Sequence, residues 1–216
     1  MSAPRDRSNN PSAAARRTAL LDAATDVVRE HGFGSATVKA ITARAGMSAG
    51  LLYSYADSVD ELLAEAFRRA AGAELAAVDE AVRAAPADAT LRLTVLVDVF
   101  ARRALRGSRL AWALLAEPVG RSIDEERIVY RRGYASLVAE LITAGIQAGQ
   151  LPPQDAQITA AGIVGAIGEA LAGPLAPLAL EPVDDKHVID AITQLCLRAA
   201  GASTCGDDRT ETQDTR

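Results

Sequence analysis

The chain has 216 residues, of which 49% are apolar and 4% aromatic, and its net charge at pH 7 is −5. This length allows one sizeable domain or two small ones, and the abundance of alanine over β-branched runs favours helices. No apolar run approaches the ~20 residues that span a bilayer, and the N-terminus lacks the apolar centre of a secretory signal, so we expect a cytoplasmic protein without a membrane partner.

The first three predicted helices have clear end signals. Apolar residues repeat with helical spacing over Ala13–Glu30, and Gly32 supplies the stop. Thr37 can cap a second helix, Gly46 permits a tight left-handed turn, and Ser48 can cap a short third helix. The sequence therefore predicts two short helices joined by a glycine-containing turn.

A long fourth helix is predicted after Ser58, because Ser58 followed by Glu61 is a capping box and an apolar face continues beyond it. Glycine and proline residues then separate five further helical stretches. These are predicted at Asp88–Arg106, Ser108–Ala116, Asp124–Ala148, Asp155–Ala172 and Asp184–Ala200. The sequence thus predicts an all-α fold of nine helices without a repeat of fixed period.

Residues that could carry catalysis or bind a metal are scarce. Cys196 and Cys205 match no metal-ligand spacing, and His31 and His187 have no acidic or thiol neighbours at such a spacing. Cys196 is predicted to be a small buried hydrophobe. The sequence has no glycine-rich phosphate loop and no nucleophile elbow. We therefore expect no enzyme, no catalytic or metal site, and no cofactor.

The charge is divided unevenly along the chain. Residues 1–56 contain seven Lys and Arg residues against four acidic ones, which gives +3, so the remaining 160 residues carry −8. A basic first segment on an acidic body is typical of a protein that meets a polyanion with one end.

The short third helix lies in the stretch SAGLLYSY, residues 48–55. The second helix of a helix-turn-helix can enter a DNA major groove, which is about 12 Å wide. Gly50 lets the backbone approach closely, tyrosine hydroxyls are good phosphate ligands, and Lys39 on the preceding helix adds counterion release. Leu52 is predicted to be a core residue, whereas the polar residues and Gly50 of this stretch together favour DNA contact.

The segment TALLDAATDVVREHGFGSATVKAITARAGMSAGLLYSYADSVDELLAEAF resembles the DNA-binding domain of the tetracycline-repressor (TetR) family of bacterial transcription regulators. It combines two alanines in the first helix, E-x-G-F, Thr37, AGMS-x-G-x-L-Y-x-Y and S-x-D-E-L. The resemblance implies a TetR-like fold with a DNA-binding domain over residues 12–68 and a ligand-binding and dimerisation domain over residues 69–200. Residues 1–11 and 201–216 are polar and are expected to be disordered.

The resemblance also implies which residues face DNA: Thr37, Lys39, Ser48, Gly50, Leu51, Tyr53, Ser54 and Tyr55. Four positions depart from the family pattern. Ala49 is often basic in relatives, Ala56 stands where phenylalanine is common, Val59 replaces a lysine that usually contacts phosphate, and Asp57 adds a negative charge. Each missing cation should lower the slope of log DNA affinity against log salt concentration by about one unit. We hypothesise that arginines of the N-terminal arm compensate, namely Arg5, Arg7, Arg16 and Arg17.

The second domain is predicted to hold an apolar pocket for a small molecule, since such sites combine apolar walls with a few polar anchors. Phe100, Trp112 and Tyr134 are the candidate pocket residues, although most apolar residues of these helices must be ordinary core. Three arginines could counter an acidic ligand but are more simply expected at the surface: Arg102, Arg103 and Arg109.

The last two helices are predicted to form a dimer interface. Small residues are dense in ITAAGIVGAIGEALAG, and each glycine disfavours an isolated helix by ~1 kcal/mol relative to alanine, which makes sense where another helix comes close. Paired across a twofold axis, the two helices would give a four-helix bundle. The candidate interface residues are Ile163, Ala166, Ile167, Ile189, Ile192 and Leu195.

The residues and the resemblance together predict a homodimeric transcriptional regulator, most simply a repressor that a small apolar effector releases from a pseudo-palindromic double-stranded DNA operator. Two alternatives stay open. One is an activator or ligand-independent regulator on the same fold, and the other is a helical enzyme or structural dimer that has lost DNA binding. The sequence identifies neither the effector nor the operator.

Overall fold

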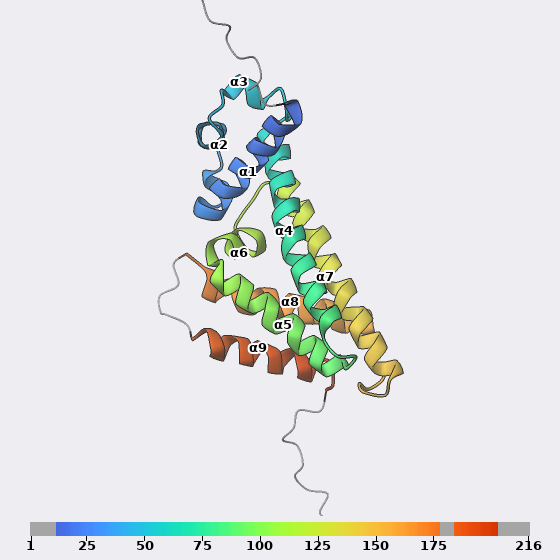
Figure 1. Cartoon of the computed structure of the whole chain (residues 1–216). Helices are drawn as coiled ribbons and strands as arrows, with labels where there is room; N and C mark the ends of the chain where they lie inside the picture. The colour runs from blue at the N-terminus through green and yellow to red at the C-terminus, as the bar shows by residue number, and fades with distance from the viewer. Residues whose placement is uncertain (1–11, 178–183, 203–216) are drawn as a thin grey trace, which may run out of the picture.

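The structure is a computed structural model that describes residues 12–177 and 184–202, and within these ranges it contains nine α-helices and one 3-10 helix (Figure 1). The predicted all-α fold of nine helices is confirmed. The elements are α1 (Ala13–His31), η1 (Phe33–Ser35), α2 (Val38–Ala45), α3 (Ala49–Leu52), α4 (Val59–Ala84), α5 (Ala89–Arg106), α6 (Ser108–Leu115), α7 (Arg121–Gln147), α8 (Ala156–Leu175) and α9 (Asp185–Ala199).

The predicted helix caps form as hydrogen bonds. The Thr37, Ser48 and Ser58 hydroxyls accept from the backbone N–H groups of Ala40, Leu51 and Glu61, and each occupies an N-cap. The capping box at Ser58 is shifted by one residue, because the Glu61 carboxylate accepts from the N–H of the preceding Asp57 at 3.3 Å.

Three predicted boundaries differ from the structure by more than one residue. Helix α7 begins at Arg121 rather than at Asp124, and α8 continues past Ala172 to Leu175, with Pro174 in its last turn. The tail predicted from Gly201 begins later, because Gly201 turns with φ +72° and the Ala202 N–H donates to the Leu197 carbonyl at 2.9 Å. The rest of the predicted tail and the arm at residues 1–11 lie outside the described residues.

The helices form a head and a body that α4 joins without a break (Figure 1). The head consists of α1, η1, α2, α3 and the first half of α4, and the body contains α5 to α9 with the rest of α4. Leu20, Ile41, Leu52 and Phe67 are buried in the head core. The predicted division at residue 68 falls inside α4, so it stays a prediction.

The two cores do not separate cleanly at α6. Ala113 and Leu114 of α6 and Ile123 of α7 are buried in the head core, although both helices belong to the body. Helix α6 also packs against α1, α5 and α8. It is therefore positioned to contact both parts of the molecule.

Helix α8 corrects the expectation that no apolar run approaches a membrane-spanning length. It has 20 residues with a mean hydropathy of 1.5 over its most apolar window, enough to cross a bilayer by length and composition. One face of α8 is buried in the body core through Ala160, Ile163, Ile167 and Leu171, and the helix packs against α7 and α9. We interpret it as a core helix with one open face.

Candidate nucleic-acid interface and interior cavity

Helices α2 and α3 form the predicted helix-turn-helix. Gly46 ends α2 in the left-handed conformation, with φ +65° and ψ 32°, and the Met47 N–H donates to the Thr42 carbonyl at 2.9 Å. Ser48 then starts α3, and the fully buried Leu52 anchors this short helix on the head core. The turn thus fixes the orientation of α3, and Leu52 is the core residue that the sequence predicted.

The opposite side of α3 is open to solvent. Ser48, Gly50, Tyr53 and Ser54 are exposed, with Tyr53 exposed at 56% of its surface. A β-carbon added at Gly50 would meet nothing within 4 Å, so the backbone here can be approached from outside. Small residues, Ser48, Ala49 and Gly50, surround the first turn of the helix, which leaves its backbone accessible.

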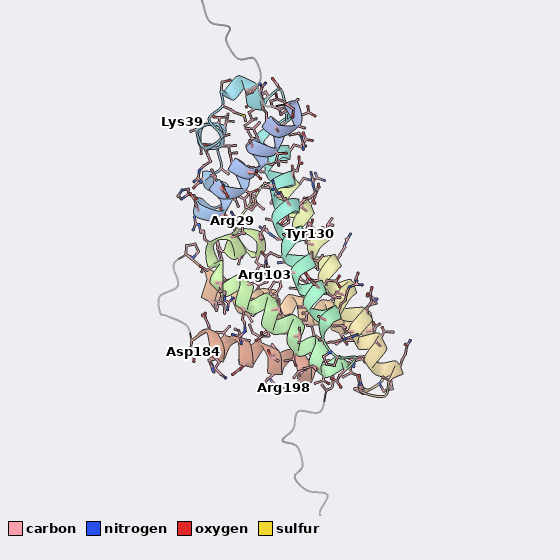
Figure 2. All side chains as sticks on the ribbon, viewed as in Figure 1. Arg29, Lys39, Arg103, Tyr130, Asp184 and Arg198 are labelled. Atoms are coloured by element: carbon pink, nitrogen blue, oxygen red, sulfur yellow. The ribbon has the colours of Figure 1, made fainter. Side chains whose placement is uncertain are left out.

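The other predicted DNA-facing residues divide into two groups. Thr37 and Lys39 are exposed at the start of α2, and Lys39 lies on the outer side of the head (Figure 2). Leu51 and Tyr55 are half-buried, and Tyr55 packs against the head core. Tyr55 therefore supports α3 with its ring as well as lying beside the open surface.

The cations of the head are largely paired with carboxylates. Arg44 donates through Nη1 to Glu30 Oε1 at 2.9 Å, which raises the pKa of Arg44 and lowers the pKa of Glu30. Arg17 donates through Nη1 to Glu65 Oε1 at 2.7 Å. Lys39 has no ion pair within the described ranges. Of the arm arginines, Arg5 and Arg7 lie outside those ranges, and Arg16 is described on α1.

The junction between α3 and α4 carries the departures from the family pattern. Ala56 and Val59 are half-buried and pack against the head core, which accounts for their apolar character. Asp57 is exposed between them. Residues 37–61 contain two cations and three acidic residues, a net charge of −1, so this surface attracts phosphate only weakly over long range.

The body encloses an apolar cavity between α4, α5, α6, α7 and α8. Its volume, counted as room for the centre of a water molecule, is about 120 Å³, enough for a small organic molecule. Helix α6 contributes Leu110, Ala111, Leu114 and Leu115 to the wall. Two of these residues, Leu110 and Leu114, also pack in the head core, so the cavity borders that core directly.

Few polar groups face the cavity. Arg103 donates through Nε and Nη2 to both carboxylate oxygens of Glu74, at 2.5 and 3.0 Å, so these two charges are paired. The Tyr130 hydroxyl donates to the Arg68 carbonyl at 2.8 Å. Figure 2 shows Arg103 and Tyr130 between the helices at the centre of the molecule.

Among the described residues that line the cavity, Arg131 is exposed without a hydrogen-bond partner, whereas Tyr134 carries a buried polar group without one. Its hydroxyl oxygen is buried and makes no hydrogen bond to any described residue. Its ring packs edge-on against Phe100, with centroids 5.2 Å apart and an interplanar angle of 89°. Burial raises the pKa of Tyr134 well above its usual value, so the group is a neutral hydroxyl at all ordinary pH values.

The structure places two of the three predicted pocket residues at the cavity. Phe100 and Tyr134 line the cavity, whereas Trp112 does not and instead lies half-buried against the body core. Sequence reasoning missed Glu74, Arg127 and Tyr130. A signal was present on α7, where the spacing of Arg127, Tyr130, Arg131 and Tyr134 places all four on one helix face.

Most of the residues predicted for the dimer interface are already buried within the protomer. Ile163, Ile167, Ile189 and Ile192 are exposed by at most 4% and pack inside the protomer, where no partner can reach them. Leu195 is 41% exposed, and Ala166 is half-buried. The exposed residues of α8 include Ile158, Ala161, Gly162, Gly165 and Ala170 together with the polar Gln157 and Glu169, and nothing lies within 4 Å of a β-carbon added at Gly162 or Gly165.

The remaining side chains with catalytic or metal-binding chemistry do not gather. Within the described ranges no group of three His, Cys, Asp or Glu side chains could hold a metal ion. His31 and His187 are exposed. Cys196 is fully buried, as a small hydrophobe would be, and Cys205 lies outside the described ranges.

A family model described as bacterial regulatory proteins, tetR family, matches residues 20–66, which include α2, α3 and the turn between them. No curated protein sequence matches the chain. Among solved structures, the fatty acid degradation regulator FadR from Bacillus halodurans is 22% identical, with a TM-score of 0.72 over 84% of this chain and 94% of that chain.

Two further structures have the same fold with a bound small molecule. The transcriptional regulator FadR from Bacillus subtilis, in complex with stearoyl-CoA, is 19% identical, with a TM-score of 0.72 over 84% of this chain and 98% of that chain. RolR, in complex with resorcinol, is 17% identical, with a TM-score of 0.67 over 88% of this chain and 89% of that chain. At these identities the structural matches establish the fold alone.

Proposed function

Because this chain belongs to the TetR family of DNA-binding transcriptional regulators, which are not enzymes, we propose that it is a repressor whose hold on its operator is released by a small apolar effector. The observation that carries this proposal is the position of α6. Leu110 and Leu114 of this helix line the cavity and also pack in the core of the head that carries the helix-turn-helix. An occupant of the cavity therefore meets the helix that supports the head.

The proposed DNA contact uses the open side of α3 together with the start of α2. Gly50 would allow close approach of the backbone, and Thr37, Lys39, Ser48, Tyr53 and Ser54 are exposed around it. Two such heads would occupy two half-sites of a pseudo-palindrome, which requires a homodimer. The open face of α8 supports that dimer, because its small residues allow a second helix to come close.

The proposed effector is an apolar molecule that carries one uncharged oxygen. The walls of the cavity are mostly apolar, Arg103 is paired with Glu74, and the Tyr134 hydroxyl has no protein partner. A ligand hydroxyl or carbonyl could bond to Tyr134 without breaking an existing contact. The resorcinol bound by RolR and the acyl chain bound by Bacillus subtilis FadR are both compatible with a mostly apolar site on this fold.

The proposal is tested by fluorescence-anisotropy titration of the full chain with DNA from upstream of its own gene, a scrambled duplex and several salt concentrations. We expect preferential binding of the upstream DNA and a linear fall of log affinity with log salt. Lys39→Gln should lower the slope by about one unit. Lys186→Gln, which changes the other lysine of the chain on α9 in the body, is the matched control.

Equal weak binding to both duplexes would place the operator elsewhere. Absence of binding even at low salt would contradict the regulator proposal and favour the alternative of a head that has lost DNA binding. A Lys39→Gln variant with an unchanged salt slope would contradict the assignment of α2 to the interface. These outcomes are separable because each variant keeps the same fold and differs in one exposed charge.

A further inference from the structure

The corner between α6 and α7 holds the head through a carboxylate. Glu117 accepts hydrogen bonds from the backbone N–H groups of Phe33 and Gly34, both at 3.0 Å, one on each carboxylate oxygen. These groups begin the 3-10 helix η1, whose own cap residue Gly32 offers no side chain. Glu117 thus performs the capping role from a position more than 80 residues away in the sequence.

The fit around this carboxylate is close. A β-carbon at Gly32 would lie 2.6 Å from Glu117 Oε2, and Gly32 also has φ +80°, so glycine is required there on two grounds. A second contact lies beside the first, where Arg109 at the start of α6 donates through Nη2 to the His31 carbonyl at 2.6 Å. The two ends of the α6 region therefore bind neighbouring stretches of backbone, Arg109 the last residue of α1 and Glu117 the start of η1.

Arg127 connects this corner to the cavity. It lines the cavity and donates to three carbonyl oxygens at the end of α6, those of Ala113 at 3.3 Å, Leu114 at 2.9 Å and Glu117 at 2.8 Å. One guanidinium thus fixes the last turn of α6 and the residue that holds the head. Glu117 is also tied to α6 itself, because it follows the helix by two residues and its N–H donates to the Trp112 carbonyl at 3.0 Å, so a displacement of α6 would move Glu117 relative to α7.

We propose that Glu117 is a positioning residue that couples the cavity to the head, by holding the turn after α1 while the cavity is empty and releasing it when α6 is pushed outward. The inference rests on the proposed function for its effect on DNA, but the contact itself can be measured without DNA. The hydrogen bonds from the Phe33 and Gly34 N–H groups should form and break together, because both are accepted by the carboxylate of one side chain.

The experiment measures hydrogen exchange of the Phe33 and Gly34 amides by NMR in the full chain. Glu117→Gln keeps the size of the side chain but replaces one acceptor oxygen with an NH₂ group, so we expect exchange at these two amides to be at least about tenfold faster. The matched control is Glu125→Gln, an equal charge change at an exposed residue of α7 whose carboxylate accepts only from Arg121 within the same helix. It should leave both amides unchanged.

Coupling is tested by narrowing the cavity from α6 with Ala111→Leu. We expect this variant to accelerate exchange at Phe33 and Gly34 in the wild-type background but to add less than about twofold in the Glu117→Gln background. Gly168→Leu, on the α8 wall where an added β-carbon meets nothing within 4 Å, is the second variant if Ala111→Leu does not fold.

A capping role without coupling predicts a different result, in which neither cavity-narrowing variant changes the exchange of the two amides. That result would overturn the proposal, as would equal exchange in wild-type and Glu117→Gln. Failure of the proposed function would instead appear as absent DNA binding with the exchange pattern intact. If the chain does bind its operator, Ala111→Leu should weaken binding about tenfold in the wild type and by less than about twofold beside Glu117→Gln.

Discussion

Replacing Gly50 with alanine separates the stability of the head from its contact with DNA. The added methyl group would project into open space, because no atom lies within 4 Å of a β-carbon at this position. Glycine disfavours a helix by up to about 1 kcal/mol relative to alanine, so Gly50→Ala should raise the free energy of unfolding by at most that amount. The gain should be small, because α3 has only four residues.

The same methyl group should weaken DNA binding if the backbone of α3 lies against the duplex. A lost specific contact corresponds to about 1–3 kcal/mol, which is roughly a five- to hundredfold rise in Kd. Stability is measured by urea denaturation followed by circular dichroism, and affinity by anisotropy at one salt concentration. An unchanged Kd in a fully folded variant would refute the assignment of α3 to the groove.

Gly46→Ala is the matched control for this experiment. A β-carbon there also meets nothing within 4 Å, but Gly46 has φ +65°, where an L-residue is disfavoured by about 1–2 kcal/mol. We therefore expect Gly46→Ala to destabilise the turn between α2 and α3. The two variants add the same methyl group, four residues apart, with opposite effects on stability.

Gly165→Glu should leave the helix content unchanged but shift the protein toward monomer in analytical ultracentrifugation, since Gly165 is open in the protomer; an unchanged dimer would exclude this face of α8. Tyr134→Phe should remove the roughly fivefold preference that we expect for 4-propylphenol over propylbenzene, measured by calorimetric titration, and a preserved preference would exclude Tyr134 as the anchor. Burial raises the pKa of the Cys196 thiol from 9.0 to about 11, so in a Cys205→Ser variant its labelling at pH 8 should be no faster than unfolding. Because that pKa is higher in the folded state, stability should fall as pH rises from about 9 toward 11, and rapid labelling at pH 8 would contradict the burial.

The features that could be predicted from the sequence depend on local chemistry. The caps at Thr37, Ser48 and Ser58 each join residues three apart, and the left-handed turn at Gly46 depends on one residue. The burial of Leu52 follows from its position on a short helix whose other side is polar and small. These features depend on residues that are close together in the sequence, so they can be predicted without knowledge of the fold.

The misassigned residues depend on how whole helices are turned in the fold. Helix α6 presents Leu110, Ala111, Leu114 and Leu115 to the cavity, and this spacing defines one face that excludes Trp112. The sequence of α6 is apolar on several faces, so it does not indicate which face is the inner one. The isoleucines of α8 and α9 pose the same problem, because helical spacing marks an apolar face without identifying its partner.

Glu117 could not have been found from its neighbours in sequence. Its partners are backbone N–H groups, which every residue except proline possesses, so they leave no trace in the side chains. The only local sign is Gly32, whose position is explained equally well by the end of α1. The contact that most directly joins the two cores is therefore the one with the least sequence signal.

The charge distribution of the head bears on the proposed use of two heads in a dimer. Arg17, which the sequence offered to DNA, and Arg44 bind Glu65 and Glu30, so phosphate must compete with carboxylates that are already in place. In the proposed complex, Lys39 would meet the duplex without such competition, since it has no ion pair within the described ranges. A single head would then hold non-specific DNA weakly, because most non-specific affinity comes from neutralising phosphates.

In a dimer, binding of the first head to DNA would raise the effective concentration of the second head at its half-site. The affinity for DNA would then grow when both heads bind at once, and it would be lost when the spacing of the heads changes. A head with few free cations thus suits a regulator whose DNA affinity is controlled by the spacing of its two heads.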